Sequence, residues 1–153
     1  MRLRQRAKAN HRSLHAELLA LIEDESWITL TVSLADRFGD NGLISVLIAR
    51  QSEQMLEIDT WLMSCRVLKR GVEQFLLNRL CSLARDRGVT NIYGKYNPTA
   101  KNSLVRNHYQ DLGFRQIVCD ENGSSQWELE LNGIQAPLKN SIKESLTNAS
   151  VTV

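Results

Sequence analysis

The sequence has few cysteines, no long apolar run and no excess of charge of one sign. Its three cysteines, Cys65, Cys81 and Cys119, are an odd number at wide spacings without a C-x-x-C pair. This pattern indicates neither a disulfide framework nor a zinc site, and we expect no bound metal. Because no stretch approaches membrane-spanning length, we expect a soluble cytoplasmic protein with no membrane partner.

Charge and length narrow the function classes further. The 19 Lys and Arg residues against 17 Asp and Glu residues give a net charge of +2, too balanced for a protein that binds nucleic acid by displacing counterions. At 153 residues and 42% hydrophobic content, the chain can bury one core and so form one domain. We expect a basic leader over 1–10, this domain over 11–132, and a flexible polar tail over 133–153.

The hydrophobic periodicity predicts an α/β fold. Apolar residues at helical spacing predict helices over 11–24, from Gly71 to Arg87-Gly88, and from Pro98 to about Leu112 with Gly113 as the stop. Alternating patterns predict strands over 27–34, 43–49, 55–65, 91–96, 114–119 and 126–131, with a hairpin turn over 36–42. A strand, a helix and a strand in succession imply a parallel pair. We therefore expect a mixed, mostly antiparallel sheet flanked by helices.

A turn at Lys69, Arg70 and Gly71 leads into the second predicted helix. Backbone N–H groups at a helix start are unpaired and carry partial positive charge, so such a turn can bind a phosphate. Gly71 permits close approach, while Lys69 and Arg70 add cationic donors. The alternative is that Gly71 only permits the turn and that the two cations form a solvated rim.

The segment from Asn102 to Phe114 is the second candidate. Asn102 and Tyr109 are seven residues apart, which puts them on one helical face. Near the helix end, the Tyr109 phenol is a candidate general acid for a departing thiolate. Its alternative is a tyrosine whose ring packs in the core with the hydroxyl at the edge.

Together, the two segments resemble the acyl-CoA-binding half of the GNAT N-acyltransferase family. The family loop, Arg/Gln-x-x-Gly-x-Gly/Ala, matches Leu68, Lys69, Arg70, Gly71, Val72 and Glu73, of which the first and the last depart from the pattern. The resemblance implies that residues 68–72 and Asn102 bind acetyl-CoA, another acyl-CoA or the phosphopantetheine arm of a carrier protein. Glu73 would then place a carboxylate near the expected pyrophosphate.

A longer resemblance, from about Glu17 to Phe114, is to the C-terminal GNAT-like domain of FkbH-like proteins. It is carried by Asp36-Arg-Phe-Gly-Asp-Asn-Gly-Leu-Ile, by Ile58-Asp-Thr-Trp-Leu-Met-Ser-Cys-Arg-Val-Leu, by Arg-Gly-Val-Glu at 70–73 and by Pro98-Thr-Ala-Lys-Asn. That family joins this module to a HAD-type phosphatase-like domain and makes glyceryl-carrier thioesters for polyketide biosynthesis. The resemblance implies an acyltransferase with an acyl carrier protein or CoA as its partner.

Two departures leave alternatives open. No Asp-x-Asp signature precedes the module and no first GNAT strand is evident, so we expect a truncated or split protein with a HAD-type partner chain. A homo-oligomer remains open. The alternatives to catalysis by this carrier-dependent route are a non-catalytic docking module and an ordinary amine N-acetyltransferase.

Asp59, on the long third strand, is the candidate base, or else it bonds to a neighbouring turn. Cys65, near the end of the same strand, could carry an acyl group if Arg66 and the helix start favour its thiolate, although buried cysteines are usually inert. We place His108 on a solvated helix face and Trp61 in core or rim packing.

Overall fold

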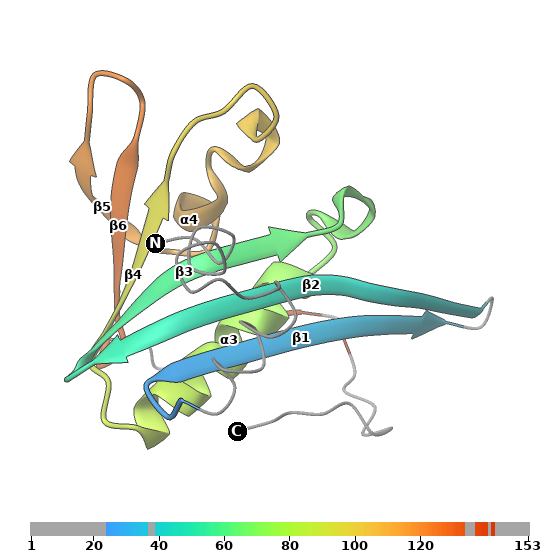
Figure 1. Cartoon of the computed structure of the whole chain (residues 1–153), viewed down its shortest axis with the longest axis horizontal. Helices are drawn as coiled ribbons and strands as arrows, with labels where there is room; N and C mark the ends of the chain where they lie inside the picture. Colours follow the sequence, from blue (N-terminus) through green and yellow to red (C-terminus); the bar gives the residue numbers. More distant parts are fainter. Residues whose placement is uncertain (1–23, 37–38, 134–136, 141, 143–153) are drawn as a thin grey trace, which may run out of the picture.

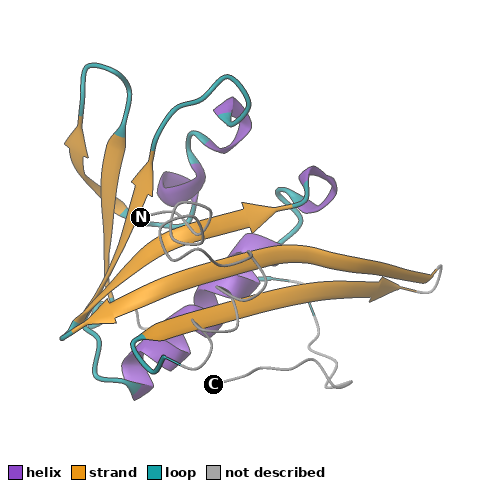
Figure 2. Cartoon of the chain, in the orientation of Figure 1, coloured by secondary structure: helices purple, strands orange, loops and turns teal. Residues whose placement is uncertain are grey.

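The segments in which apolar and polar residues alternate form strands, and six strands make one sheet. The computed structural model describes residues 24–36, 39–133, 137–140 and 142. Its strands are β1 (Trp27–Asp36), β2 (Gly39–Ser52), β3 (Met55–Met63), β4 (Asn91–Tyr96), β5 (Arg115–Cys119) and β6 (Ser125–Glu130). They lie in the order β1-β2-β3-β4-β6-β5, and only the β3–β4 pair is parallel (Figures 1 and 2). The predicted mixed, mostly antiparallel sheet is confirmed.

The hairpin of β1 and β2 is longer than its sequence pattern predicts. Pairing continues through Ala35 with Asp40 and Asp36 with Gly39, so the turn predicted over 36–42 is too long. The predicted leader and the predicted helix over 11–24, up to residue 23, lie outside the described residues. The part of the chain that is described has no helix long and apolar enough to cross a membrane.

The helix α3 (Val72–Asp86) covers one face of the sheet (Figure 1). Gly71 precedes it in the left-handed region at φ 90°, which favours glycine, and Gly88 follows at φ 73°. The predicted start and end of this helix are therefore confirmed. Its buried apolar side chains pack into the core with residues of β2, β3 and β4, and each buried leucine contributes about 1.5–3 kcal/mol. They are Val72, Leu76, Leu77, Leu80, Cys81 and Ala84.

The parallel pair separates towards its carboxyl ends. Pairing between β3 and β4 is limited to Met55–Glu57 of β3 and Asn91–Tyr93 of β4. Beyond these residues, β3 continues to Met63 and β4 to Tyr96 without pairing to each other. On the other side of β3, Ile48 pairs with Thr60 and Ala49 with Ile58, which leaves Asp59 as an extra, bulged residue. Bulges bend a strand and increase its twist, and Figure 1 shows β3 and β4 diverging beyond this region.

The long helix predicted from Pro98 to Leu112 is wrong. Only two short helical segments form, η2 (Ser103–Val105) and α4 (His108–Asp111). The Asn102 side chain explains the break. Its Oδ1 accepts from the backbone N–H of Thr99 at 2.7 Å and its Nδ2 donates to the carbonyl of Asn97 at 2.8 Å. Such side-chain bonds to the backbone compete with helical bonds.

The polar tail contacts α3 at one described position. Asn78 Nδ2 donates to the Leu138 carbonyl and the Leu138 N–H donates to Asn78 Oδ1, both at 2.8 Å. Leu138 and Ile142 also pack against the core. At these residues the chain is docked rather than free, while most of the predicted flexible tail lies outside the described residues.

Candidate functional site

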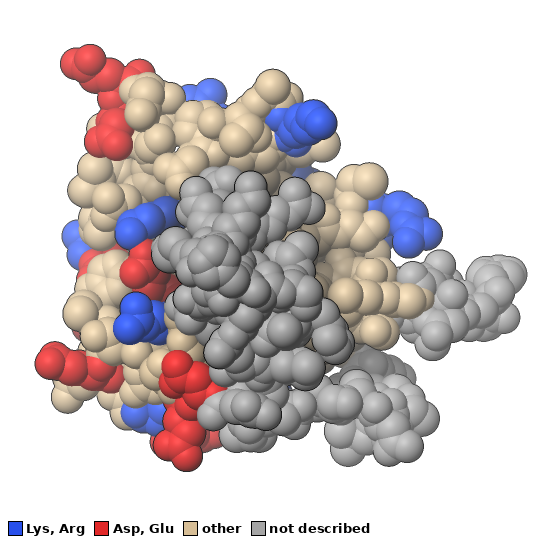
Figure 3. Space-filling view, in the orientation of Figure 1, with Lys and Arg blue, Asp and Glu red and all other residues tan. Residues whose placement is uncertain are grey.

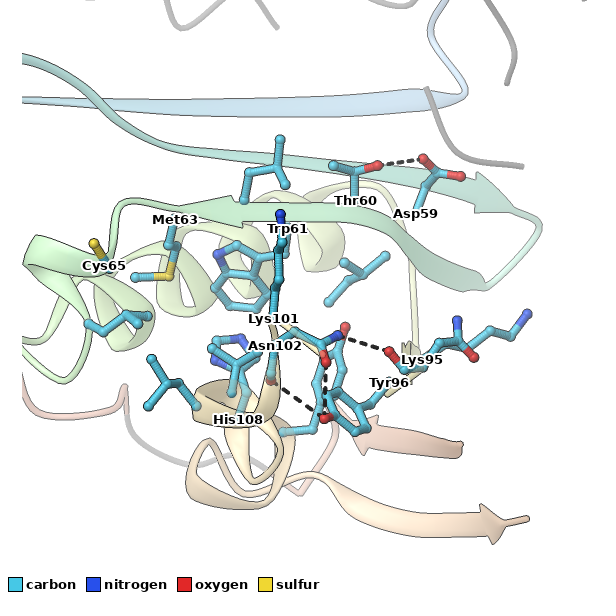
Figure 4. Close-up of a pocket in the computed structure, with 17 residues that line it drawn as sticks. Asp59, Thr60, Trp61, Met63, Cys65, Lys95, Tyr96, Lys101, Asn102 and His108 are labelled. Atoms are coloured by element: carbon cyan, nitrogen blue, oxygen red, sulfur yellow. Dashed lines mark hydrogen bonds between the residues drawn. The ribbon is translucent and has the colours of Figure 1, made fainter. Parts of the chain in front are cut away.

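The separation of β3 and β4 opens a cavity of about 500 Å³. Its walls come from β3, from the end of β4 with the following loop, and from η1 (Cys65–Val67), η2 and α4 (Figure 4). Among the residues predicted as site residues, Asp59, Cys65, Leu68, Asn102 and Tyr109 line it. The fold therefore brings together residues from both segments that the sequence singles out.

Tyr109 is buried and lines this cavity. Its ring packs directly over the backbone of β4 at Gly94, where an added Cβ would lie 2.2 Å from Tyr109 Cε1. The ring also contacts Phe114, with 5.1 Å between ring centroids. Burial raises the pKa of Tyr109 well above its ordinary value of 10.0, and a hydrogen bond with the backbone of Lys95 acts in the opposite direction. The phenol therefore keeps its proton at neutral pH.

Asp59 is half-buried at the bulge of β3. Its Oδ2 accepts a hydrogen bond from Thr60 Oγ1 at 2.8 Å. Figure 4 shows both side chains on the opposite side of the β3 ribbon from Trp61 and Asn102. Asp59 is one of the residues that line the cavity, and its role as the base remains a prediction.

Cys65 carries an exposed free thiol in η1. The neighbouring Arg66 is also exposed, and its Nε donates to Ser64 Oγ at 3.4 Å. The thiol is accessible, so it is not one of the buried, inert cysteines that the sequence left open. Its role as an acyl carrier remains a prediction.

Asn102 lines the cavity, but its amide is used within the loop. Besides its two backbone bonds, its Oδ1 accepts from the hydroxyl of Tyr96 at 3.3 Å. The side chain fixes the loop that forms one wall. Cofactor binding by Asn102 stays a prediction that these bonds make harder to satisfy.

The predicted anion turn differs from an open phosphate cradle. Lys69 and Gly71 have positive φ of 60° and 90°. The Lys69 N–H donates to Glu73 Oε1 at 2.6 Å, and the Arg70 N–H donates to the Val67 carbonyl at 3.3 Å. Two backbone donors of the turn are therefore occupied by the protein itself. The Arg70 side chain is exposed, and Val72 is buried in the core.

Glu73 itself turns inward. Only 6% of the residue is exposed, and its Oε2 has no hydrogen-bond partner among the described residues. The sequence pattern marked Glu73 as a departure but left open whether it points outward. An acid in the first helical turn was the available signal, since the helix dipole favours negative charge there.

The sequence predicts His108 on a solvated helix face, and this prediction is wrong. The imidazole packs edge-on against Trp61, with ring centroids 4.4 Å apart. Burial lowers the pKa of His108 below its ordinary value of 6.5, while Glu73 and Asp111 act in the opposite direction. His108 lines the first cavity and also a second one of about 450 Å³, which reaches the start of α3. No local pattern could have found this contact, because Trp61 lies far from His108 in the sequence.

Comparisons with known proteins bear on the fold. No protein-family model matches the sequence, and no curated protein matches it. Solved structures do match. The GNAT domain of S. lividans PAT is 18% identical, with a TM-score of 0.59 over 78% of this chain and 70% of that chain.

Two further similar structures contain coenzyme A. PaiA N-acetyltransferase from Thermoplasma acidophilum, in complex with coenzyme A, is 13% identical with a TM-score of 0.59 over 82% of this chain and 74% of that chain. An acetyltransferase from Bacillus subtilis, in complex with CoA, is 17% identical with a TM-score of 0.51 over 69% and 78%. At such low identities the likeness extends to the fold alone. The chain therefore has the fold of the GNAT acetyltransferases.

Proposed function

We propose that the chain is an acyltransferase that holds the pantetheine arm of an acyl thioester in the cavity between β3 and β4. The observation that carries the proposal is the separation of the parallel strands past Glu57 and Tyr93. Beyond this point the β4-facing edge of β3 borders the cavity. An extended arm with amide groups can pair with such an edge as an added strand does.

The lining suits this arm. Leu104 and Val105 offer apolar contact, while Tyr109 brings a hydroxyl from a buried ring. Ligand sites commonly combine a mainly apolar wall with a few polar groups that fix orientation. On the face shown in Figure 3, the described basic and acidic side chains are interspersed.

In the proposed reaction, a lone pair of the acceptor attacks the thioester carbonyl carbon, and the π electrons move onto oxygen. When the carbonyl re-forms, the C–S bond breaks and its electron pair leaves with sulfur. Tyr109 donates a proton to that sulfur, and Asp59 accepts the proton that the acceptor loses. In the other version, the thiolate of Cys65 attacks first and carries the acyl group as a thioester.

The buried setting of Tyr109 refines this role. Because burial raises its pKa, the phenol is a weaker acid than an exposed tyrosine and gives up its proton to a thiolate less readily. Its hydrogen bond to the departing sulfur therefore supplies more of the proposed stabilisation.

The donor and its pathway are proposed from the resemblance in the sequence. A glyceryl-type or other acyl group on an acyl carrier protein, in polyketide or related secondary metabolism, agrees with the resemblance to FkbH-like proteins. CoA is the other source of the arm, and two structures with this fold contain it. A HAD-type phosphatase-like chain is the proposed partner.

Replacing Tyr109 with Phe tests the enzyme. The variant keeps the ring that packs on Gly94 and removes the hydroxyl, so the rate of acyl transfer should fall by about 10²-fold or more. The affinity for pantetheine should change little. The rate is measured as thiol release from acyl-pantetheine and acetyl-CoA, with carrier protein, simple amines or thiols as acceptors.

Tyr96→Phe is the matched control, because Tyr96 also lines the cavity but its hydroxyl donates to Asn102. An unchanged rate in Tyr109→Phe would remove the phenol from the mechanism. Turnover with simple amines and acetyl-CoA alone would favour the amine N-acetyltransferase.

A second candidate is a non-catalytic module that docks a carrier protein or a phosphatase-like partner. The bond between Glu73 and the Lys69 N–H favours it, since the carboxylate takes a donor that a phosphate would use. Binding of pantetheine without any thiol release in the wild type would support this candidate over the enzyme.

A further inference from the structure

At the start of α3, the Glu73 carboxylate lies where the turn would otherwise bind an anion from a ligand. Glu73 Oε1 accepts the Lys69 N–H at 2.6 Å, within a turn shaped by positive φ at Lys69 and Gly71. The residue is buried to 94%, since only 6% of its surface is exposed. A carboxylate at this place is stabilised by the same N–H groups and helix dipole that would stabilise a phosphate.

Glu73, Gln74 and His108 line the second cavity. Glu73 Oε2 and Gln74 Oε1 are buried without a partner among the described residues, and both side chains line this cavity. His108 Nε2, also without a partner in that part of the chain, lines it as well.

The second cavity is unfavourable for an anionic ligand. Glu73 and Asp111 line the cavity, with Lys69 as the basic side chain among its described lining residues. A diphosphate entering here would lie beside the buried carboxylate and would find the Lys69 N–H taken. Like charges placed together without water between them weaken binding strongly.

The two cavities are neighbours, since five residues line both. They are Cys65, Leu68, Leu104, Val105 and His108. An arm held between β3 and β4 by its thioester end would run past His108 towards the start of α3, where Glu73 lies.

We propose that Glu73 is a specificity-determining residue that excludes the nucleotide diphosphate of CoA, so that the site takes an arm without the nucleotide. A carrier protein bears such an arm through a single phosphodiester, which brings less negative charge to the turn than the diphosphate of CoA. This inference rests on the proposed function, because it concerns the donor of the same site. In this proposal, the Glu73 carboxylate takes the place of the ligand phosphate that the turn would otherwise bind.

Calorimetry with CoA and with pantetheine tests the proposal. Wild-type protein should bind CoA no more tightly than pantetheine. Glu73→Ala removes the carboxylate and frees the Lys69 N–H, so the affinity for CoA should rise by about tenfold or more while that for pantetheine stays within about twofold.

Glu73→Gln provides a second variant that keeps an oxygen acceptor for the Lys69 N–H and supports folding. It should gain CoA affinity to an intermediate degree, because only the charge is lost. Asp111→Asn is the matched control: it removes an exposed carboxylate of the same cavity that does not bind the turn. It should leave the ratio of the two affinities nearly unchanged.

Three results would overturn the proposal. They are CoA binding at least about tenfold tighter than pantetheine in the wild type, an unchanged ratio in both Glu73 variants, and an equal gain in Asp111→Asn. Absence of pantetheine binding by the wild type would instead reject the proposed function, and the inference with it. The pantetheine titration therefore distinguishes the two failures.

Discussion

Gly94 is the position where one added methyl group should disturb the site most directly. It lies in β4 opposite Trp127 of β6, and its φ is outside the left-handed region that favours glycine. Alanine can therefore adopt this backbone without strain. The cost of Gly94→Ala must come from the side-chain contact alone.

The contact is severe. An added Cβ would lie 2.2 Å from Tyr109 Cε1 and 2.3 Å from Cζ, whereas carbon atoms prefer about 3.5–4.0 Å. The ring must move by more than about 1 Å, but Phe114 and Trp127 pack on it. We expect Gly94→Ala to lower the free energy of unfolding by about 1–3 kcal/mol. For a chain of this size the melting temperature should fall by about 2–12 °C.

A double-mutant cycle identifies the cause. Tyr109→Ala removes the ring and is itself destabilising, but in that background Gly94→Ala should cost less than about 0.5 kcal/mol. The measurement is urea unfolding of the wild type, both single variants and the double variant. An equal cost of Gly94→Ala in both backgrounds would refute the reasoning, because the clash with the ring would then not be its source.

Two further predictions concern titrating groups. The pKa of His108 is lowered in the folded chain, so the unfolded state binds more protons near pH 6 and stability should fall as the pH drops below about 6.5. Urea midpoints at about pH 7.5 and about pH 5.5 should therefore differ less in His108→Gln than in the wild type, and an equal difference would contradict this. Burial raises the pKa of Cys81 to about 11, so iodoacetamide at about pH 8 should modify the exposed Cys65 and leave Cys81 unmodified until the protein unfolds. Mass spectrometry measures both thiols, and modification of Cys81 in the folded chain would contradict its burial.

The elements that the sequence predicts well are those defined by local patterns. α3 follows from apolar residues at helical spacing between two glycines, and both glycines have positive φ in the structure. The strands follow from alternation, and the parallel pairing of β3 and β4 from the helix between them. The long helix expected after Pro98 does not form, because the Asn102 side chain makes hydrogen bonds to the backbone of Thr99 and Asn97. These bonds compete with the backbone hydrogen bonds of a helix.

The candidate site divides in the same way. Sequence alone is enough to predict the mixed sheet, the turn before α3 and Tyr109 as a site residue, because these depend on residues close together in the chain. Three further features are visible only in the folded protein: β3 and β4 separate, Tyr109 packs on Gly94, and Glu73 turns inward to the Lys69 N–H. The first two depend on packing between elements far apart in the sequence. Glu73 and the Lys69 N–H are only four residues apart, but the burial of Glu73 depends on how the rest of the chain packs around the start of α3.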